Sequence, residues 1–317
     1  MVSFLGHAPK GFDHLLSVIR FGAFDGGQRV SIGIRNSVVP CINVRWFSRL
    51  AITQKSTFLI AAQDNMSAKE ILRKTQRGFW ERTHYGPIRY QLPSLLNIGT
   101  ANIIRLLRPR VQPRDSVLEI GFAPGKILAY LAIKCEATVC GLDYSEQGIS
   151  VSRDLFRRLG IQADLRCEDL FDSTFAKSSF DFVYSLGFLE HFDNPELVVE
   201  RHHQYLKPGG HGLIAIPNYG GIYGSIQARF DPDNLKIHNL NIMQPDSLRR
   251  LATGLDCSEI KVYRFGRVNP WLMSLDKKWP QPLAQSLNLI GNVAGLLQPM
   301  DVPGVCPLLV MEFTRGK

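Results

Sequence analysis

The residues best suited to chemistry are carboxylates and glycines that end successive apolar runs in the middle of the chain. Glu119 and Gly121 end one run, and Gly125 follows in a short bend of small residues. Asp143 closes the next apolar run, 22 positions after Gly121. A buried strand, a tight bend and a helix bring a ligand close to bare backbone and to a helix N-terminus. The spacing of Asp143 predicts a carboxylate that binds the two hydroxyls of a ribose.

Three classes of ligand compete for this bend. A dinucleotide site has the pattern G-x-G-x-x-G, whereas positions 123 and 126 here are Ala and Lys. A triphosphate loop is one residue longer, and Ile127 stands where that loop has its magnesium-binding hydroxyl. The third ligand, S-adenosylmethionine, has no phosphate and is cationic at its reacting end. Nearby carboxylates attract a cation and repel phosphate, so the residues favour the third ligand.

Five segments follow one another from about residue 115 to residue 218, and their order and spacing carry a resemblance. They are Glu119–Gly125, Gly141–Ser145, Cys167–Leu170, Phe180–Ser185 with Leu189–His191, and Leu206–Gly210 with Leu213–Ile216. Together they resemble the motifs of the class I S-adenosylmethionine-dependent methyltransferases of the small-molecule type. The chain departs from that pattern at Phe122-Ala123-Pro124, where the family more often has a small residue or Cys and then Gly. Ala123 restricts the backbone, and Pro124 removes an amide donor. These differences change the contacts expected from the loop, but the expected ligand stays the same.

The resemblance implies which residues bind the cofactor. Asp143 would hold the ribose hydroxyls, and Asp169 would accept from the adenine amino group. Glu119 would face the ammonium end, with a purely structural role as its main alternative. The full implied set is Glu119, Gly121, Ala123, Gly125, Asp143, Tyr144, Asp169, Leu170, Ser185 and Leu186.

Methyl transfer from a sulfonium is an in-line displacement, in which the protein positions two reactants and excludes water. An oxygen acceptor usually needs a base, whereas an amine acceptor must be neutral. The predicted catalytic residues are Tyr184, within an apolar run, and His191, which follows that run at the ligand edge of the sheet. His238 is a further candidate. A cofactor-shaping or helix-capping role is the alternative for His191. His202 and His203 are expected at the surface or in packing.

Strand-like and helix-like segments alternate through the body of the chain, which predicts a mainly parallel sheet with right-handed crossovers. With the family resemblance, we expect a Rossmann-like α/β fold of seven strands, with helices on both faces and an antiparallel last strand. The expected strands are 116–121, 137–143, 162–167, 180–185, 212–217, 258–264 and 307–314. The expected helices of the body are 125–135, 146–159, 194–206 and one near 246–253.

The chain divides into three predicted regions. Residues 1–65 show no sustained period and are interpreted as a poorly ordered or spurious extension, with Met66 as an alternative start. Residues 66–114 form a helical lead-in, in which the aromatic segment 79–85 lies over the cofactor or packs on the sheet. Residues 115–317 form the methyltransferase-like domain.

Two long insertions interrupt that domain, at 218–245 and 266–304, and loops of this length are usually functional or disordered. The first leaves the sheet at its ligand-binding edge and is a candidate lid over the acceptor. The second contains Trp271, Trp279 and an apolar helix over 283–297. That helix packs on the core or offers an apolar face to a membrane or a second subunit.

Composition sets further bounds. Six cysteines without a C-x-x-C pair are typical of reduced core residues, so we predict a cytoplasmic protein without a metal site or disulfides. No apolar run reaches about 18 residues, which predicts no transmembrane segment. The net charge of +9 is concentrated before residue 116, and the remainder of the chain carries −2. A basic lead-in suits nucleic acid, an anionic membrane surface or an acidic substrate, or is a solvated helix face.

These observations predict an enzyme that transfers a methyl group from S-adenosylmethionine to a small molecule, at oxygen in preference to carbon or nitrogen. The segment Leu189-Glu190-His191 most resembles enzymes of quinone and lipid-type metabolism. Two alternatives stay open, an RNA or protein methyltransferase that docks through residues 66–115 and a non-catalytic cofactor-binding module. The sequence Ser185-Leu186-Gly187-Phe188 lacks the Pro-Pro motif of enzymes that methylate nucleic-acid amino groups, which disfavours nucleic acid.

Overall fold

The structure is a computed structural model that describes residues 73–82 and 90–317. Its backbone contacts divide the chain into Met1–Lys69 and Glu70–Lys317, and everything below concerns the second unit. The predicted N-terminal extension, the alternative start at Met66, and His84 with Tyr85 lie outside the described residues.

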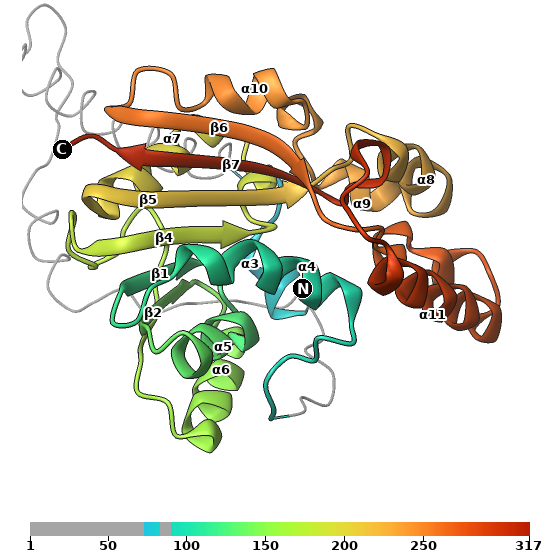
Figure 1. Cartoon of the computed structure of the whole chain (residues 1–317), viewed down its shortest axis with the longest axis horizontal. Helices are drawn as coiled ribbons and strands as arrows, with labels where there is room; N and C mark the ends of the chain where they lie inside the picture. Colours follow the sequence, from blue (N-terminus) through green and yellow to red (C-terminus); the bar gives the residue numbers. More distant parts are fainter. Residues whose placement is uncertain (1–72, 83–89) are drawn as a thin grey trace, which may run out of the picture. The chain divides into compact units, whose positions relative to one another are not determined.

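Seven strands form one sheet in the order β3-β2-β1-β4-β5-β7-β6 (Figure 1). Strands β1 to β5 are parallel, and β7 runs antiparallel between β5 and β6. The strands are β1 Ser116–Ile120, β2 Thr138–Asp143, β3 Asp164–Cys167, β4 Phe180–Leu186, β5 Leu206–Pro217, β6 Cys257–Phe265 and β7 Leu308–Arg315. This confirms the predicted Rossmann-like sheet with its antiparallel last strand. Strand β5 begins earlier than predicted, because Leu206 pairs with Phe180 ahead of a bulge.

Most helices of the domain fall where the sequence predicts them. The helices are α3 Arg77–Glu81, α4 Ile98–Leu107, α5 Lys126–Lys134, α6 Glu146–Leu159, α7 Pro195–Tyr205, α8 Ile222–Phe230, α9 Pro232–Lys236, α10 Pro245–Arg250 and α11 Gln281–Leu297. Helix α6 illustrates the local signals, because Ser145 accepts from the Gly148 amide at its start and Gly160 adopts a left-handed conformation at its end. Within the predicted helical lead-in of residues 66–114, the described residues 73–82 form only the short helix α3.

Two apolar clusters cover the two faces of the sheet, because side chains alternate along each strand. Val117 and Tyr184 belong to the cluster that contains α4, α5 and α6, whereas Leu118 and Val183 belong to the cluster under α7 and α10. Within the described residues, no helix is both long enough and apolar enough to cross a membrane.

Strand β1 lies between β2 and β4, so the strand order reverses at its carboxyl end. Open parallel sheets bind ligands in the crevice at such a reversal. Figure 1 shows α8, α9 and α11, which come from the two insertions, grouped beyond the carboxyl ends of β4 and β5.

Candidate functional site

The bend after β1 depends on two glycines. Gly121 and Gly125 have φ angles of +72° and +78°, in the left-handed region that residues with a Cβ rarely adopt. A Cβ added to Gly121 would lie 2.5 Å from a ring carbon of Phe188, on the loop after β4. Both positions therefore require glycine for the chain to turn from β1 into α5.

Asp143, at the end of β2, fastens this bend. One carboxylate oxygen accepts from the Ala123 amide at 3.1 Å, and the other accepts from the Ser145 amide at 2.9 Å. Burial raises the pKa of Asp143, and the backbone amides that it accepts oppose that rise. The carboxylate thus holds the bend against the start of α6 and keeps lone pairs for a ligand.

Glu119 and Tyr184 form a pair inside the sheet, because β1 and β4 place them directly opposite each other. The Tyr184 hydroxyl donates to the Glu119 carboxylate at 2.7 Å, and both side chains are buried. Burial raises the pKa of Glu119 to about 8 and holds the pKa of Tyr184 well above its usual value. The structure places this pair in the core under α5 and α6, away from the cavity described next.

A cavity of about 350 Å³ lies at the crevice beside β1, within the usual size range of ligand pockets. Seven predicted site residues line it, namely Gly121, Ala123, Asp143, Tyr144, Leu170, Leu186 and His191. Glu119, Gly125, Asp169, Ser185 and Tyr184 do not. A larger hollow of about 550 Å³ surrounds Lys207 and Glu312 at the opposite ends of the strands, where sheets of this type do not bind ligands.

Asp169 and Ser185 are engaged by other side chains. Asp169 forms an ion pair with Arg73, whose guanidinium lies 5.0 Å from the ring centre of Tyr144, and also accepts from the Phe171 amide at 2.9 Å. Ser185 is buried, with its hydroxyl 3.0 Å from Nε2 of His202. His202 is therefore a packing residue, as expected, and fixes α7 on β4.

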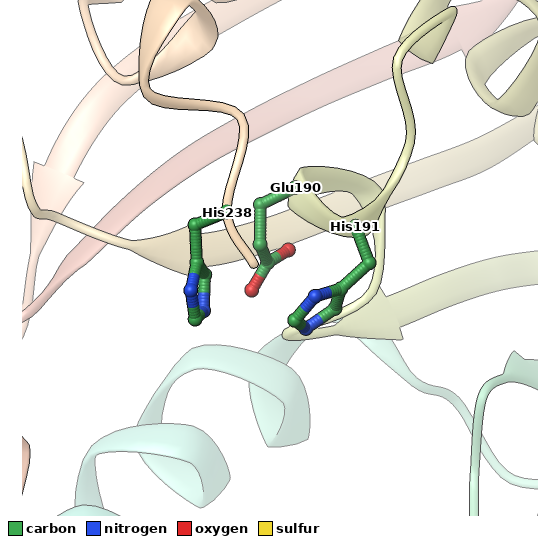
Figure 2. A group of neighbouring side chains, drawn as sticks. All are labelled: Glu190, His191 and His238. Atoms are coloured by element: carbon green, nitrogen blue, oxygen red, sulfur yellow. The ribbon is translucent and has the colours of Figure 1, made fainter. Parts of the chain in front are cut away.

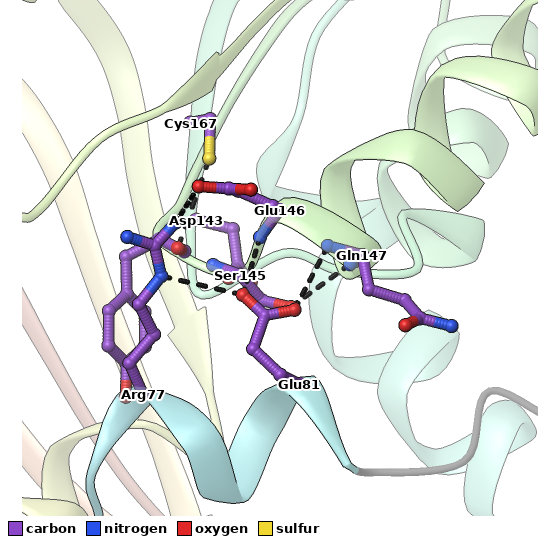
Figure 3. Close-up of polar contacts among 9 residues, drawn as sticks. Arg77, Glu81, Asp143, Ser145, Glu146, Gln147 and Cys167 are labelled. Carbon is purple, nitrogen blue, oxygen red and sulfur yellow. Dashed lines mark hydrogen bonds and ion pairs between the residues drawn. The ribbon is translucent and has the colours of Figure 1, made fainter. Parts of the chain in front are cut away.

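Residues 73–82 close one side of the cavity. Trp80, from the aromatic segment that the sequence placed over the cofactor or on the sheet, lines the cavity, together with Arg73 and Thr75, which the sequence did not single out. Glu81 accepts from the backbone amides of Glu146 and Gln147 at 2.8 and 3.1 Å, at the N-terminus of α6 (Figure 3). A distant carboxylate thereby satisfies amides that a helix leaves unpaired at its first turn.

His191 lies in a short 3₁₀ turn, Leu189–His191, directly after β4. Its Nδ1 lies 2.9 Å from the Ile237 carbonyl oxygen, and its ring packs edge-on against Trp80 at 5.0 Å. Because a carbonyl only accepts, Nδ1 carries the proton and Nε2 keeps a lone pair. Burial lowers the pKa of His191 to about 4, helped by the neighbouring His238, so the ring is neutral at pH 7.

The insertion at 218–245 brings His238 to the same place. The ring centres of His191 and His238 are 4.7 Å apart, and Tyr219 packs on the other side of His238. Asn239 anchors this contact, since its backbone amide donates to the Glu190 carbonyl at 2.6 Å and its side-chain amide donates to the Phe192 carbonyl at 3.0 Å. A segment far along the chain thus packs against His191 and the turn after β4.

Comparison with known proteins bears on the region that contains this cavity. Residues 118–214 match the family model described as a methyltransferase domain. This region of the chain is a methyltransferase domain of the class I S-adenosylmethionine-dependent type. The matched region contains the bend after β1, Asp143 and His191, and S-adenosylmethionine is the cofactor of the family.

Several curated proteins are similar to this chain over much the same region. The methyltransferase GfsG of Streptomyces halstedii is 32% identical over 154 residues, 47% of this chain and 54% of the relative. A ubiquinone biosynthesis O-methyltransferase of Idiomarina loihiensis is 37% identical over 97 residues, 30% of this chain and 39% of the relative. The chain therefore spans about half or less of the length of these curated relatives.

Solved structures support the fold of the methyltransferase. Phosphoethanolamine N-methyltransferase 2 of Haemonchus contortus, in complex with S-adenosyl-L-methionine, has a TM-score of 0.52 at 17% identity. The match covers 76% of this chain and 60% of that structure. At this identity the similarity concerns the fold alone.

The residues of this chain fit the cofactor of the family. Gly121 leaves bare backbone at the floor of the cavity, and Asp143 presents a half-buried carboxylate beside it. The bend offers few free amides to a phosphate, because Pro124 has none and the Ala123 amide already donates to Asp143. This donor set suits a nucleoside with a cationic end better than a pyrophosphate.

Proposed function

We propose that this chain transfers the methyl group of S-adenosylmethionine to a hydroxyl oxygen of a small-molecule acceptor. The observation that carries the proposal is the position of His191, a neutral imidazole that lines the same cavity as Gly121 and Asp143. The cofactor, when bound, supplies an electrophilic methyl group on its sulfonium. What the protein must add is placement of the acceptor, exclusion of water and a group that takes the hydroxyl proton.

His191 is the proposed proton acceptor. The bond from Nδ1 to the Ile237 carbonyl fixes the ring and leaves Nε2 to accept from an acceptor hydroxyl. The low pKa of His191 keeps the ring neutral through the physiological range, although it also makes the imidazole a weak base. The proton transfer is therefore expected to accompany methyl transfer and not to precede it.

Aromatic side chains around His191 provide the dry enclosure that a displacement reaction needs. Trp80 stands edge-on to the imidazole, while Phe188 and Phe192 line the cavity with their rings 4.9 Å apart. Asp143 and Leu170 are proposed to hold the ribose and adenine parts of the cofactor. Asp169, paired with Arg73, is proposed to contribute at the rim.

The relatives support a small-molecule acceptor but divide over the atom that is methylated. Their names include ubiquinone biosynthesis O-methyltransferases and phosphoethanolamine N-methyltransferases. A neutral imidazole beside the cavity favours oxygen, because a hydroxyl must lose a proton and a neutral amine need not lose one before it attacks.

The test combines cofactor binding with acceptor discovery. Purified full-length protein is titrated with S-adenosylhomocysteine by calorimetry and then incubated with cell extracts and a donor carrying a radiolabelled methyl group. We expect saturable binding and label in the small-molecule fraction, with His191→Gln reducing turnover at least tenfold at unchanged cofactor affinity. His211→Ala, an exposed imidazole bonded to Thr314, is the control. Displacement of the ligand by NADH or ATP, or label found in acid-precipitable polymer, would overturn the proposal.

A further inference from the structure

We propose that Glu190, His191 and His238 form a binding site for one divalent cation of the zinc class. Figure 2 shows the three side chains turned toward a common point, two from the turn after β4 and one from the first insertion. All three are buried, and one ligand atom from each lies within 4.8 Å of the others. The sequence predicted no metal site, because no spacing motif joins His191 to a histidine in the insertion.

The distances suit a shared ion. Zinc bonds to imidazole nitrogen and carboxylate oxygen at about 2.0–2.2 Å, so two ligands of one tetrahedral ion lie about 3.5 Å apart. The ligand atoms now lie within 4.8 Å of one another, and side-chain shifts of about 1 Å, shared among the three residues, would bring them to that spacing. The backbone therefore already places the three ligands where one ion can reach them.

Both imidazoles are prepared as ligands. Nδ1 of His191 lies 2.9 Å from the Ile237 carbonyl, and Nδ1 of His238 lies 2.5 Å from the Asn234 carbonyl. Each carbonyl can only accept, so each Nδ1 carries a proton and each Nε2 keeps its lone pair. A ring nitrogen that donates to a backbone carbonyl while the other nitrogen ligates is the usual arrangement around protein-bound metals.

Glu190 is the observation that calls for a cation. Its side chain is fully buried, and neither carboxylate oxygen has a hydrogen-bond partner within the described residues. No ion pair of Glu190 occurs in that part of the chain. Moving an ionised carboxylate from water into the protein interior without a partner costs on the order of several kcal/mol. A cation bound to the carboxylate oxygens offsets this loss of hydration. The unpaired oxygens face the two histidines (Figure 2).

The donor set points to the class of ion. Magnesium and calcium prefer sites made entirely of oxygen, whereas two imidazoles and one carboxylate suit zinc and related transition metals. Three protein ligands leave a fourth position open, as in zinc sites that bind a reacting molecule. His191 lines the cofactor cavity, so the open position lies at the acceptor side.

One consequence rests on the proposed function. A hydroxyl oxygen that occupies the open position would have its pKa lowered by the cation, which relieves His191 of a task for which it is a weak base. In the metal-loaded protein His191 would then be a ligand that places the acceptor, and the hydroxyl proton would pass to bulk water as the hydroxyl binds the ion.

The test measures metal binding by the full-length chain. Protein treated with a chelator and dialysed is titrated with ZnCl₂ by calorimetry, and with CoCl₂ while the visible absorption of tetrahedral cobalt is recorded. We expect one ion per chain, with at least tenfold weaker binding in His238→Ala and in Glu190→Gln. His211→Ala, which removes an exposed imidazole remote from the cluster, should bind zinc as the wild type does.

Two measurements keep the outcomes distinct. Affinity for S-adenosylhomocysteine reports whether each variant is folded, because Glu190 and His238 do not line the cofactor cavity. Absence of stoichiometric zinc in the wild type, or zinc bound equally well by a folded His238→Ala, would overturn the metal site. Methyl transfer that persists undiminished in chelator with no bound metal overturns the role of the ion in proton loss and leaves the proposed function standing. Zinc binding without any small-molecule methylation would leave the metal site standing and overturn the proposed function.

Discussion

The surroundings of Asp143, on the proposed cofactor side, and of Glu190, on the proposed acceptor side, treat their carboxylates in opposite ways. Asp143, after β2, accepts two backbone amides from the bend and from the start of α6. Glu190, after β4, has no partner on either oxygen within the described residues. The protein itself supplies hydrogen-bond donors to Asp143. The carboxylate oxygens of Glu190 have no donor among the described residues, so a bound ligand could pair with them.

The two sides also differ in how they are assembled. The contacts of Asp143 join residues that are close in sequence, all between β1 and α6. The acceptor side depends on bonds across more than forty residues, from His191 to Ile237 and from Phe192 to Asn239. A local assembly is rigid before any ligand arrives, whereas the acceptor wall is only as stable as the docking of the insertion.

The largest expected effect comes from breaking the cofactor side. Asp143→Ala removes the acceptor of two amides and the proposed ribose ligand, and charged hydrogen bonds contribute about 1.5–3 kcal/mol each. We expect the affinity for S-adenosylhomocysteine to fall by two to three orders of magnitude in calorimetry, on the order of 3–4 kcal/mol. Asp154→Ala, on the exposed face of α6, is the control and should bind normally. Near-normal binding by the Asp143 variant would show that the bend is not the cofactor site.

A second prediction concerns Glu119, the carboxylate that the protein satisfies with Tyr184. Burial raises the pKa of Glu119 from its ordinary value of 4.5 to about 8. Between these values the unfolded chain loses the proton while the folded chain keeps it, so stability falls as pH rises. Glu119→Gln cannot titrate and keeps an acceptor for the Tyr184 hydroxyl, so it should escape this loss.

The difference should be measurable by denaturant unfolding at several pH values. Relative to the variant, the wild type should lose about 2–4 kcal/mol between pH 5 and pH 8. Parallel stability curves for the two proteins would mean that Glu119 is ionised in the fold.

A third prediction tests the acceptor wall. Asn239→Ala removes the bond from its side-chain amide to the Phe192 carbonyl and leaves that buried acceptor unpaired, at a cost of about 1–2 kcal/mol. We expect a lower rate of methyl transfer with cofactor affinity changed less than threefold, because the loosened wall carries His238 and holds His191. Asn241→Ala, an exposed neighbour on the same insertion, is the matched control. A loss of cofactor affinity as large as the loss of rate would mean that the two sides are not separable.

The same contrast explains what the sequence could predict. The strands, the capping of α6 by Ser145 and Gly160, and the bend after β1 follow from signals within a few residues. Contacts between distant segments left no such signal, which is why the pairing of Arg73 with Asp169 and the bond from Asn239 to Phe192 were missed. His238 was named only as a further candidate, without its direct contact with His191.

Tyr184 shows a further limit of prediction from sequence. The run from Phe182 to Tyr184 is apolar throughout and buried on both faces of the sheet, so its pattern does not tell which side chains face the ligand. The structure turns Tyr184 toward Glu119, on the face under α5 and α6. Its proposed catalytic role therefore has less support from the geometry than that of His191, which lines the cavity.

The smallest expected effect concerns the segment that borders both sides. Glu81 reaches across to the first turn of α6 and holds residues 73–82 against the cavity, where Trp80 meets His191 (Figure 3). Losing a helix-capping acceptor costs about 1 kcal/mol, so Glu81→Ala should lower the thermal midpoint by a few degrees. Glu81→Gln, which can still accept from the amides, should lose less. Because Trp80 touches the acceptor side and Arg73 the cofactor rim, Glu81→Ala should weaken cofactor binding and slow turnover by similar small factors. A change in cofactor binding alone would mean that residues 73–82 serve only the cofactor side, and a change in turnover alone would mean that they serve only the acceptor side.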